Sequence, residues 1–265
     1  MPVSIYQTNN NNPSNIYRMN TDDIPLTSMT DKCLVLDLDQ TLIATQEDVD
    51  DLKSLKILTD PKQMELRKRT YYLSIDDIGA PGEGSRYDFW GVTRPHIDEF
   101  LIFCFSYFKI VGVCSAGKRP YVEAICDHLF RNIRPPHFMY SYDDLDWDEK
   151  NRPIKRLTKI INSNNILKKH MTLENTLALD DYEITFSKNR GNGVLIPEYI
   201  PDTKSKPKIS TLSRDEHSLL QFKYWLLQPE VMKCSDVTTL NKVPIFTTPL
   251  NQYKSKLSVS GYHFL

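Results

Sequence analysis

The sequence carries almost no net charge. Its 33 basic and 34 acidic side chains give a formal charge of −1 over 265 residues. A chain without a field of one sign has no general attraction for nucleic acid or for an anionic membrane. We therefore expect neither as a direct partner. The length suits one α/β domain with extensions, or two small domains.

Long hydrophobic runs and targeting signals are also missing. The longest apolar stretch, residues 100–108, is far too short to span a bilayer. Residues 1–30 are polar and contain no apolar segment of the kind that signal peptides carry. The five cysteines are odd in number and form no CxxC pair, which is typical of reduced thiols. These absences predict an intracellular protein, nuclear or cytoplasmic, without a transmembrane segment.

The composition divides the chain into three parts. Residues 1–30 are Asn-rich and are predicted to be a disordered extension. Residues 31–228 hold the periodic segments and are predicted to form one domain, with a β insertion at about 46–92. Residues 229–265 show no clear period and are predicted to be a tail. The richness in Asn, Lys and Ile is typical of an AT-rich genome, such as that of a microbial eukaryote or a large DNA virus.

Strand-like and helix-like segments alternate along the middle part. Apolar runs of strand length lie at residues 33–38, 109–114, 137–140, 176–179 and 194–196. Helical spacing predicts helices at residues 97–108, 120–129, 155–161 and 212–227, the last with Ser213 as its N-cap. Two aromatic runs, 71–75 and 87–92, flank a Gly/Pro-rich turn and predict a hairpin, whereas residues 46–69 could be helix or loop. The alternation predicts a largely parallel sheet with right-handed crossovers.

The most informative segment is residues 34–42, LVLDLDQTL, where an apolar strand ends in two aspartates. Residues two apart in a strand point to the same side, so Asp37 and Asp39 are expected to face one spot. Two such carboxylates repel unless a cation or a shared proton intervenes, and carboxylate oxygens suit Mg²⁺. An exposed acidic turn is the alternative, but the buried-type strand before the pair favours a site.

Two further predicted strands end in polar side chains. Ser115 follows the second long apolar run, and Asp180 and Asp181 follow the third. Lys155 lies between them at a predicted helix start. Carboxyl ends of neighbouring parallel strands meet at one sheet edge, so these groups should gather there. Carboxylates, a hydroxyl and an ammonium group are the parts that phosphoryl transfer requires.

These segments resemble the motifs of the haloacid dehalogenase superfamily and, within it, of the RNA polymerase II C-terminal-domain phosphatase family. The matching pieces are DLDQTL at 37–42, RPHIDEFL at 94–101, SAG at 115–117 with Tyr121, KRLTK at 155–159, LDD at 179–181 and NGV at 192–194. The resemblance covers about residues 32–228 and matches the small members that consist of a catalytic module. It implies an α/β fold with a Rossmann-like parallel sheet flanked by helices and a small β-hairpin insertion.

The resemblance also implies the chemistry of the two aspartates. Asp37 would attack phosphorus and form an aspartyl-phosphate. Asp39 would protonate the leaving oxygen and then activate water. Mg²⁺ would be held by the Asp37 carboxylate, the Asp39 backbone carbonyl and Asp181.

Other residues would act on the phosphoryl group or on these acids. By resemblance, Ser115 donates a hydrogen bond to the phosphoryl oxygens and Lys155 neutralises their charge. Lys155 is preferred to its neighbours Arg156 and Lys159 by motif alignment alone. Asp180, which would orient the lysine or a metal-bound water, and Thr41 take supporting positions.

Some positions depart from the family pattern. Gln40 stands where many members have Glu, and Ser115 where many have Thr. Residues 143–149 are strongly acidic where a basic contact to a substrate is expected. Tyr71, Tyr72, Tyr87, Phe89 and Trp90 are available for a hydrophobic pocket in the insertion, although hairpin packing is the alternative. His96 beside Pro95 is interpreted as structural.

The implied function is that of a Mg²⁺-dependent protein serine/threonine phosphatase. Its partner would be a flexible phosphorylated protein segment, such as the RNA polymerase II tail. A phosphatase of small molecules is one alternative, although the modest insertion leaves an open site. A non-catalytic phosphopeptide-binding or scaffold domain is another, although the motifs are retained. A cysteine nucleophile is disfavoured, because the arginines after Cys114 and Cys126 come one position too early for Cys-x5-Arg.

Overall fold

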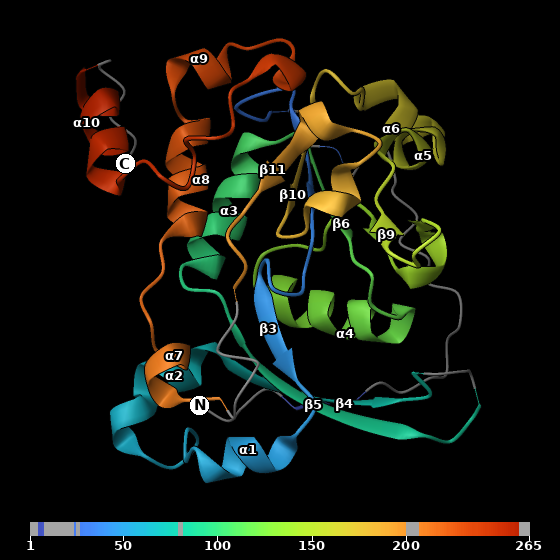
Figure 1. The fold of residues 1–265 in the computed structure, drawn as a ribbon, viewed down its shortest axis with the longest axis vertical. Helices are drawn as coiled ribbons and strands as arrows, with labels where there is room; N and C mark the ends of the chain where they lie inside the picture. The colour runs from blue at the N-terminus through green and yellow to red at the C-terminus, as the bar shows by residue number, and fades with distance from the viewer. Residues whose placement is uncertain (1–4, 8–23, 25–26, 79–81, 200–206, 260–265) are drawn as a thin grey trace.

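A parallel sheet forms the centre of the molecule. The computed structural model describes residues 5–7, 24, 27–78, 82–199 and 207–259 (Figure 1). The strands of the sheet are β2 (Cys33–Leu36), β6 (Ile110–Cys114), β7 (Met139–Tyr140), β10 (Thr176–Asp180) and β11 (Gly193–Leu195). Their order is β11-β10-β2-β6-β7, and all neighbours are parallel. Every residue of β2, β6 and β10 is buried, as in parallel sheets that are covered on both faces.

Side chains of the sheet alternate between two hydrophobic cores. Leu34 and Leu36 share one core with α3 (Ile97–Tyr107), α4 (Arg119–Phe130) and α8 (Ser218–Leu226). Cys33 and Val35 share the other with α5 (Leu157–Asn162) and α6 (Asn165–His170). Figure 1 shows α3 and α8 on one side of the strands and α5 and α6 on the other. The predicted Rossmann-like α/β fold is confirmed.

A second, smaller sheet adjoins this core. Its strands, in spatial order, are β1 (Ile5–Gln7), β4 (Thr70–Asp76), β5 (Arg86–Thr93) and β3 (Ile43–Gln46). Antiparallel β4 and β5 form the predicted hairpin, and β1 pairs in parallel with β4. The segment left open between helix and loop contains α1 (Val49–Ser54) and α2 (Met64–Arg69). Tyr71 and Trp90 are fully buried, so these two aromatic rings pack the sheet and do not line a pocket.

Two predicted helices start later than the sequence indicates. The helix expected from residue 155 is α5, and Lys155 precedes it, directly after β9 (Pro153–Ile154), which pairs with β8 (Asp146–Trp147). The helix expected at 212–227 is divided into α7 (Ile209–Leu212) and α8. Ser213 is therefore the C-cap of α7, and the prediction that it is an N-cap is wrong. Between the helices Glu216 accepts a hydrogen bond from the Ser218 backbone and pairs with Arg94, which holds the chain out of a continuous helix.

The end of the chain contains regular structure that the sequence does not predict. α9 (Pro229–Met232) and α10 (Leu250–Val259) follow α8, and Figure 1 shows α10 beside it. Val231, Ile245 and Tyr253 are buried in the same core as α8, so this segment packs on the domain. The predicted N-terminal extension lies largely outside the described residues. Among the helices that are described, none is long and apolar enough to cross a membrane.

Candidate active site

The carboxyl ends of β2, β6 and β10 open into one cavity of about 680 Å³. The predicted motifs lie around it because parallel strands bring their carboxyl ends to the same edge. The residues that line it are Asp37, Asp39, Gln40, Ser115, Ala116, Gly117, Pro153, Lys155, Asp180, Asp181, Tyr182, Thr185 and Glu198.

A buried lysine joins two of the acids. Lys155 Nζ lies 2.5 Å from Asp37 Oδ1 and 2.7 Å from Asp180 Oδ2. All three side chains are less than a tenth exposed. Charged groups are buried at such depth only when they are paired, so the three side chains depend on one another. The structure thus brings together three of the predicted site residues.

Burial shapes the acidity of this cluster. It raises the pKa of the Asp37 carboxyl; the Lys155 ammonium lowers that pKa in part, and the Asp180 charge adds to the rise. Burial disfavours the charge of Lys155, but the carboxylates of Asp180 and Asp37 outweigh burial and raise its pKa. A second cation near the carboxylates would relieve the remaining repulsion between them.

Thr41 holds the Asp181 side chain in place. Its Oγ1 donates to Asp181 Oδ1 at 3.0 Å and accepts from the Asp181 backbone N–H at 3.1 Å. Thr41 is fully buried, so this pair of bonds is shielded from water. Burial and the neighbouring Asp180 charge raise the pKa of Asp181 to about 6. Thr41 therefore links the loop after β2 to the loop after β10.

Three carboxylates form a group with the dimensions of a metal site. One oxygen each from Asp37, Asp180 and Asp181 lies within 4.8 Å of the others. All are hard oxygen ligands on a cavity wall, which suits Mg²⁺. The Asp39 carboxylate is not in this group, so among the predicted metal residues it could contribute only through its backbone. Asp180, predicted in a supporting position, belongs to the group and also contacts the lysine.

Two hydroxyls hold the Asp39 side chain. Tyr121 Oη donates to Asp39 Oδ1 at 2.5 Å, and Thr45 Oγ1 donates to the same oxygen at 3.3 Å. Thr45 also contacts the Tyr71 hydroxyl at 2.7 Å. Burial raises the pKa of Asp39, while the Tyr121 and Thr45 hydrogen bonds oppose the rise. Tyr121 belongs to a sequence motif, but the motif does not indicate its role. No sequence pattern marks Thr45 as a site residue.

Ser115 lies at the end of β6, nearly inaccessible to solvent. Its Oγ accepts from the Gly117 backbone N–H at 3.1 Å, which closes the tight loop at 115–117. A Cβ atom on Gly117 would lie 2.6 Å from the Tyr121 ring, so only glycine fits there. The loop, Tyr121 and Asp39 are thereby packed as one unit.

The two other basic residues of the lysine motif do not contact the carboxylates of the cavity. Arg156 and Lys159 both pair with Asp146, at 2.7 and 3.1 Å, and both are more than a third exposed. Other acids of residues 143–149 are matched as well, since Asp144 pairs with Arg119 and Asp148 with Arg152. The acidic segment that departs from the family pattern is therefore largely neutralised by its own neighbours.

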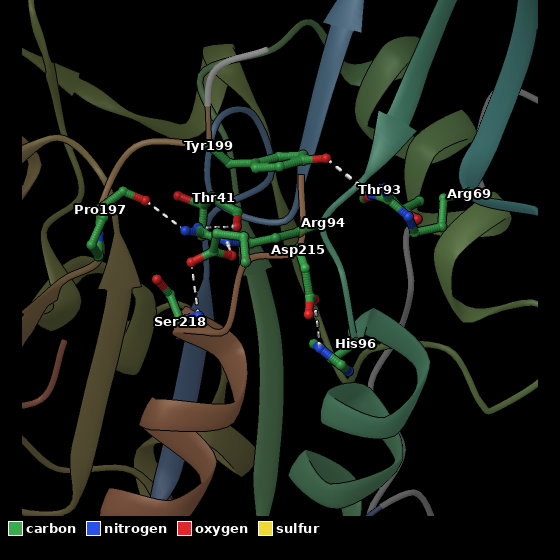
Figure 2. Close-up of polar contacts among 10 residues, drawn as sticks. Thr41, Arg69, Thr93, Arg94, His96, Pro197, Tyr199, Asp215 and Ser218 are labelled. Carbon is green, nitrogen blue, oxygen red and sulfur yellow. Dashed lines mark hydrogen bonds and ion pairs between the residues drawn. The ribbon is translucent and has the colours of Figure 1, made fainter. Parts of the chain in front are cut away.

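Arg94 ties the site to the rest of the fold. Its fully buried guanidinium donates to the Thr41 carbonyl at 2.9 Å and the Pro197 carbonyl at 2.8 Å, and pairs with Glu216 at 2.7 Å (Figure 2). The Arg94 guanidinium carbon lies 5.4 Å from the centroid of the Tyr199 ring. The Tyr199 backbone N–H donates to the Gln40 carbonyl at 2.6 Å. Arg94 belongs to the motif at residues 94–101, but the sequence alone does not indicate its role.

The parallel sheet, the paired aspartates after β2 and the buried lysine define an α/β protein of the haloacid dehalogenase type. Residues 32–224 match the family model described as NLI interacting factor-like phosphatase. The chain belongs to this family, which is the C-terminal-domain phosphatase family that the motifs resemble. Among curated protein sequences no match is found.

Two solved structures have the same fold. One is a variant of the fission yeast RNA polymerase II CTD phosphatase Fcp1 bound to beryllium fluoride, with 14% identity and a TM-score of 0.53 over 89% of this chain and 57% of that chain. The other is Fcp1 described as an essential RNA polymerase II CTD phosphatase, with 15% identity and a TM-score of 0.50 over 88% and 67%. The chain thus spans between about half and two thirds of these proteins.

Proposed function

We propose that this protein is a Mg²⁺-dependent phosphatase that works through an aspartyl-phosphate on Asp37. The observation that carries the proposal is the buried group of Asp37, Lys155 and Asp180 at the carboxyl edge of the sheet, beside Asp181. Family membership supports the same reaction class.

In the first step Asp37 Oδ attacks phosphorus, a P–O bond forms, and the bond from phosphorus to the substrate oxygen breaks. Asp39 gives its proton to that leaving oxygen. Burial keeps the pKa of Asp39 raised, which supports a protonated acid. Tyr121 and Thr45 both donate to Oδ1, so Oδ2 is the oxygen assigned to carry the proton. In the second step Asp39 takes a proton from water, which attacks phosphorus and releases phosphate and free Asp37.

Asp37 and Asp181 would hold Mg²⁺, with Asp180 in the same group of carboxylates. The Asp39 backbone carbonyl is assigned as a further ligand. When bound, the ion would neutralise charge on the transferring oxygens. Lys155 is assigned to the same task from the protein side. Ser115 is assigned to orient the phosphoryl oxygens, since its hydroxyl hydrogen is not used by the bond that it accepts from Gly117.

The proposed substrate is phosphoserine or phosphothreonine in a flexible protein segment of the polymerase-tail kind. The similar structures are described as CTD phosphatases, which supports this class of substrate. Tyr182, an exposed aromatic residue on the cavity wall, is available to contact the peptide on either side of the phosphorylated residue. Such a substrate implies a nuclear or cytoplasmic protein.

The first test is hydrolysis of an aryl phosphate with and without Mg²⁺. Asp37→Asn should lower kcat by at least ~10³-fold, as expected for loss of a nucleophile. Asp143→Asn, an exposed acid paired with Lys118, is the matched control and should keep full activity. Full activity in Asp37→Asn would exclude this nucleophile. No activity in folded, Mg²⁺-loaded protein would favour the non-catalytic binding domain.

The same assay with phosphopeptides and small phosphate esters tests the substrate class. We expect a higher kcat/KM for phosphoserine or phosphothreonine peptides than for phosphotyrosine peptides and for nucleotide or sugar phosphates. A preference for the small esters would support the small-molecule alternative.

A further inference from the structure

Three potential metal ligands meet at a second place, between two helices. His96 is the residue before α3, His217 is the residue before α8, and Asp215 lies in the segment that leads to α8. One ligand atom of each lies within 4.8 Å of the other two. The elements of the fold therefore bring together two imidazoles and a carboxylate from distant parts of the chain.

The distances within this cluster are those of ligands rather than of hydrogen bonds. His96 Nε2 lies 3.6 Å from Asp215 Oδ1, and His217 Nε2 lies 3.5 Å from Asp215 Oδ2. Both exceed the usual range of an N–H···O bond. Ligands bound at about 2.0–2.1 Å in tetrahedral geometry are about 3.4 Å apart, which is the spacing seen here.

The side-chain environment of His96 is unusual for a partly exposed histidine. Its Nε2 atom is inaccessible to solvent and has no hydrogen-bond partner among the described residues. Buried polar atoms without partners are rare and require an explanation. The residue also adopts a left-handed backbone conformation, with φ of 66°, and Figure 2 shows its ring directed at Asp215. A metal ion would supply the missing partner.

The alternative is a simple ion pair between protonated histidines and Asp215. The N to O distances of 3.6 and 3.5 Å are longer than the 2.7 Å of the hydrogen-bonded Arg94–Glu216 pair, so a close ion pair does not account for this arrangement. The Asp215 side chain is 73% exposed, so water can reach a further coordination position.

We propose that His96, Asp215 and His217 bind Zn²⁺, with water as the fourth ligand. Imidazole nitrogens select Zn²⁺ and related transition metals, whereas Mg²⁺ prefers the all-oxygen group at Asp37. The ion would clamp the start of α3 to the start of α8. Because Asp215 precedes Glu216, it would also support the bond of Glu216 to Arg94. The proposal does not depend on the phosphatase function.

The test is Zn²⁺ titration of the full chain in the presence of excess Mg²⁺. The imidazole ¹⁵N resonances of His96 and His217 should shift together, and Zn²⁺ should raise Tm. In His217→Ala the Zn²⁺ affinity should fall roughly ten-fold or more, as for other disrupted metal sites. His170→Ala, a histidine outside the cluster, should behave like the native chain.

Residue-specific resonances are required because Cys234 and the active-site acids could also bind Zn²⁺. Unmoved His96 and His217 resonances at saturating Zn²⁺ would overturn the proposal, as would native affinity in folded His217→Ala. Should His217→Ala fail to fold, the resonances of the native protein decide the question.

Discussion

At the scale of single residues, Lys155 is the side chain on which the candidate site most depends. Lys155→Met removes the cation between the buried Asp37 and Asp180 carboxylates. Because unpaired buried charge is costly, the free energy of unfolding should fall by about 3 kcal/mol. The kcat for an aryl phosphate should fall by ~100-fold or more, since the charge on the phosphoryl oxygens is no longer neutralised. Urea unfolding and steady-state kinetics measure the two effects.

Lys159→Met is the control for this substitution. Lys159 pairs with Asp146 near the surface, where an ion pair contributes ~1 kcal/mol or less. Equal losses of stability and activity in the two variants would show that Lys155 has no special place in the site.

Tyr121→Phe tests the hydroxyls around Asp39. The hydrogen bond from Tyr121 lowers the pKa of Asp39, so its removal should raise that pKa further. The limb of the pH–rate profile that reports Asp39 should therefore move to higher pH, while the packing of the ring on Phe89 is kept. Tyr107→Phe, which removes a hydroxyl bonded to the Leu226 carbonyl, is the control and should leave the profile unchanged. A profile that does not move in Tyr121→Phe would contradict the assignment of Asp39.

At the scale of elements, Arg94 connects β5, the loop after β2 and the start of α8. Arg94→Met leaves Glu216 and the Thr41 and Pro197 carbonyls without their partner, so the free energy of unfolding should fall by about 3–5 kcal/mol. Arg131→Met, at an exposed pair with Asp127, should cost ~1 kcal/mol or less. Denaturant unfolding measures the stability of both variants. Similar unfolding midpoints would contradict a central role for Arg94.

The central elements could be predicted because their sequence pattern and their burial agree. β2 and β6 are apolar throughout and β10 is apolar at residues 177–179, since both faces of the sheet are covered, and a predicted site residue follows each apolar run. The gathering of Asp37, Ser115 and Asp180 follows from parallel pairing alone. The choice of Lys155 does not, because only the folded structure shows that Lys155 pairs with Asp37 and Asp180 whereas Arg156 and Lys159 pair with Asp146.

Other elements could not be predicted because long-range contacts determine them. Ser213 suits a helix start, but the pairing of Glu216 with Arg94 moves that start to Ser218. Thr45 has no local signal, since its place beside Asp39 depends on the pairing of β3 with β5. The segment after Gln228 shows no single period because its buried side chains come from three separate elements: α9, a 3-10 turn at Val237–Thr239, and α10.

At the scale of the whole molecule, residues 241–259 pack on the domain and should contribute to its stability. A chain that ends at residue 240 loses Ile245, Tyr253 and Leu257 from the core. At about 1.5–3 kcal/mol for each buried side chain, the free energy of unfolding should fall by roughly 4 kcal/mol or more. Thermal and urea unfolding measure the loss. A chain that ends at residue 259 is the control, and equal stability of the two would restore the prediction of a tail.

The long reach of the active-site contacts also has a consequence for biosynthesis. Lys155 follows Asp37 by 118 residues, and Glu216 follows Arg94 by 122. A ribosome that adds about 5–20 residues per second needs roughly 6–25 s for either interval. During that time the nascent chain already carries both aspartates of the DLD motif, but it has neither the lysine nor the strand that gathers the remaining acids. The candidate site is therefore incomplete on the nascent chain, and it assembles only when nearly the whole domain has left the ribosome.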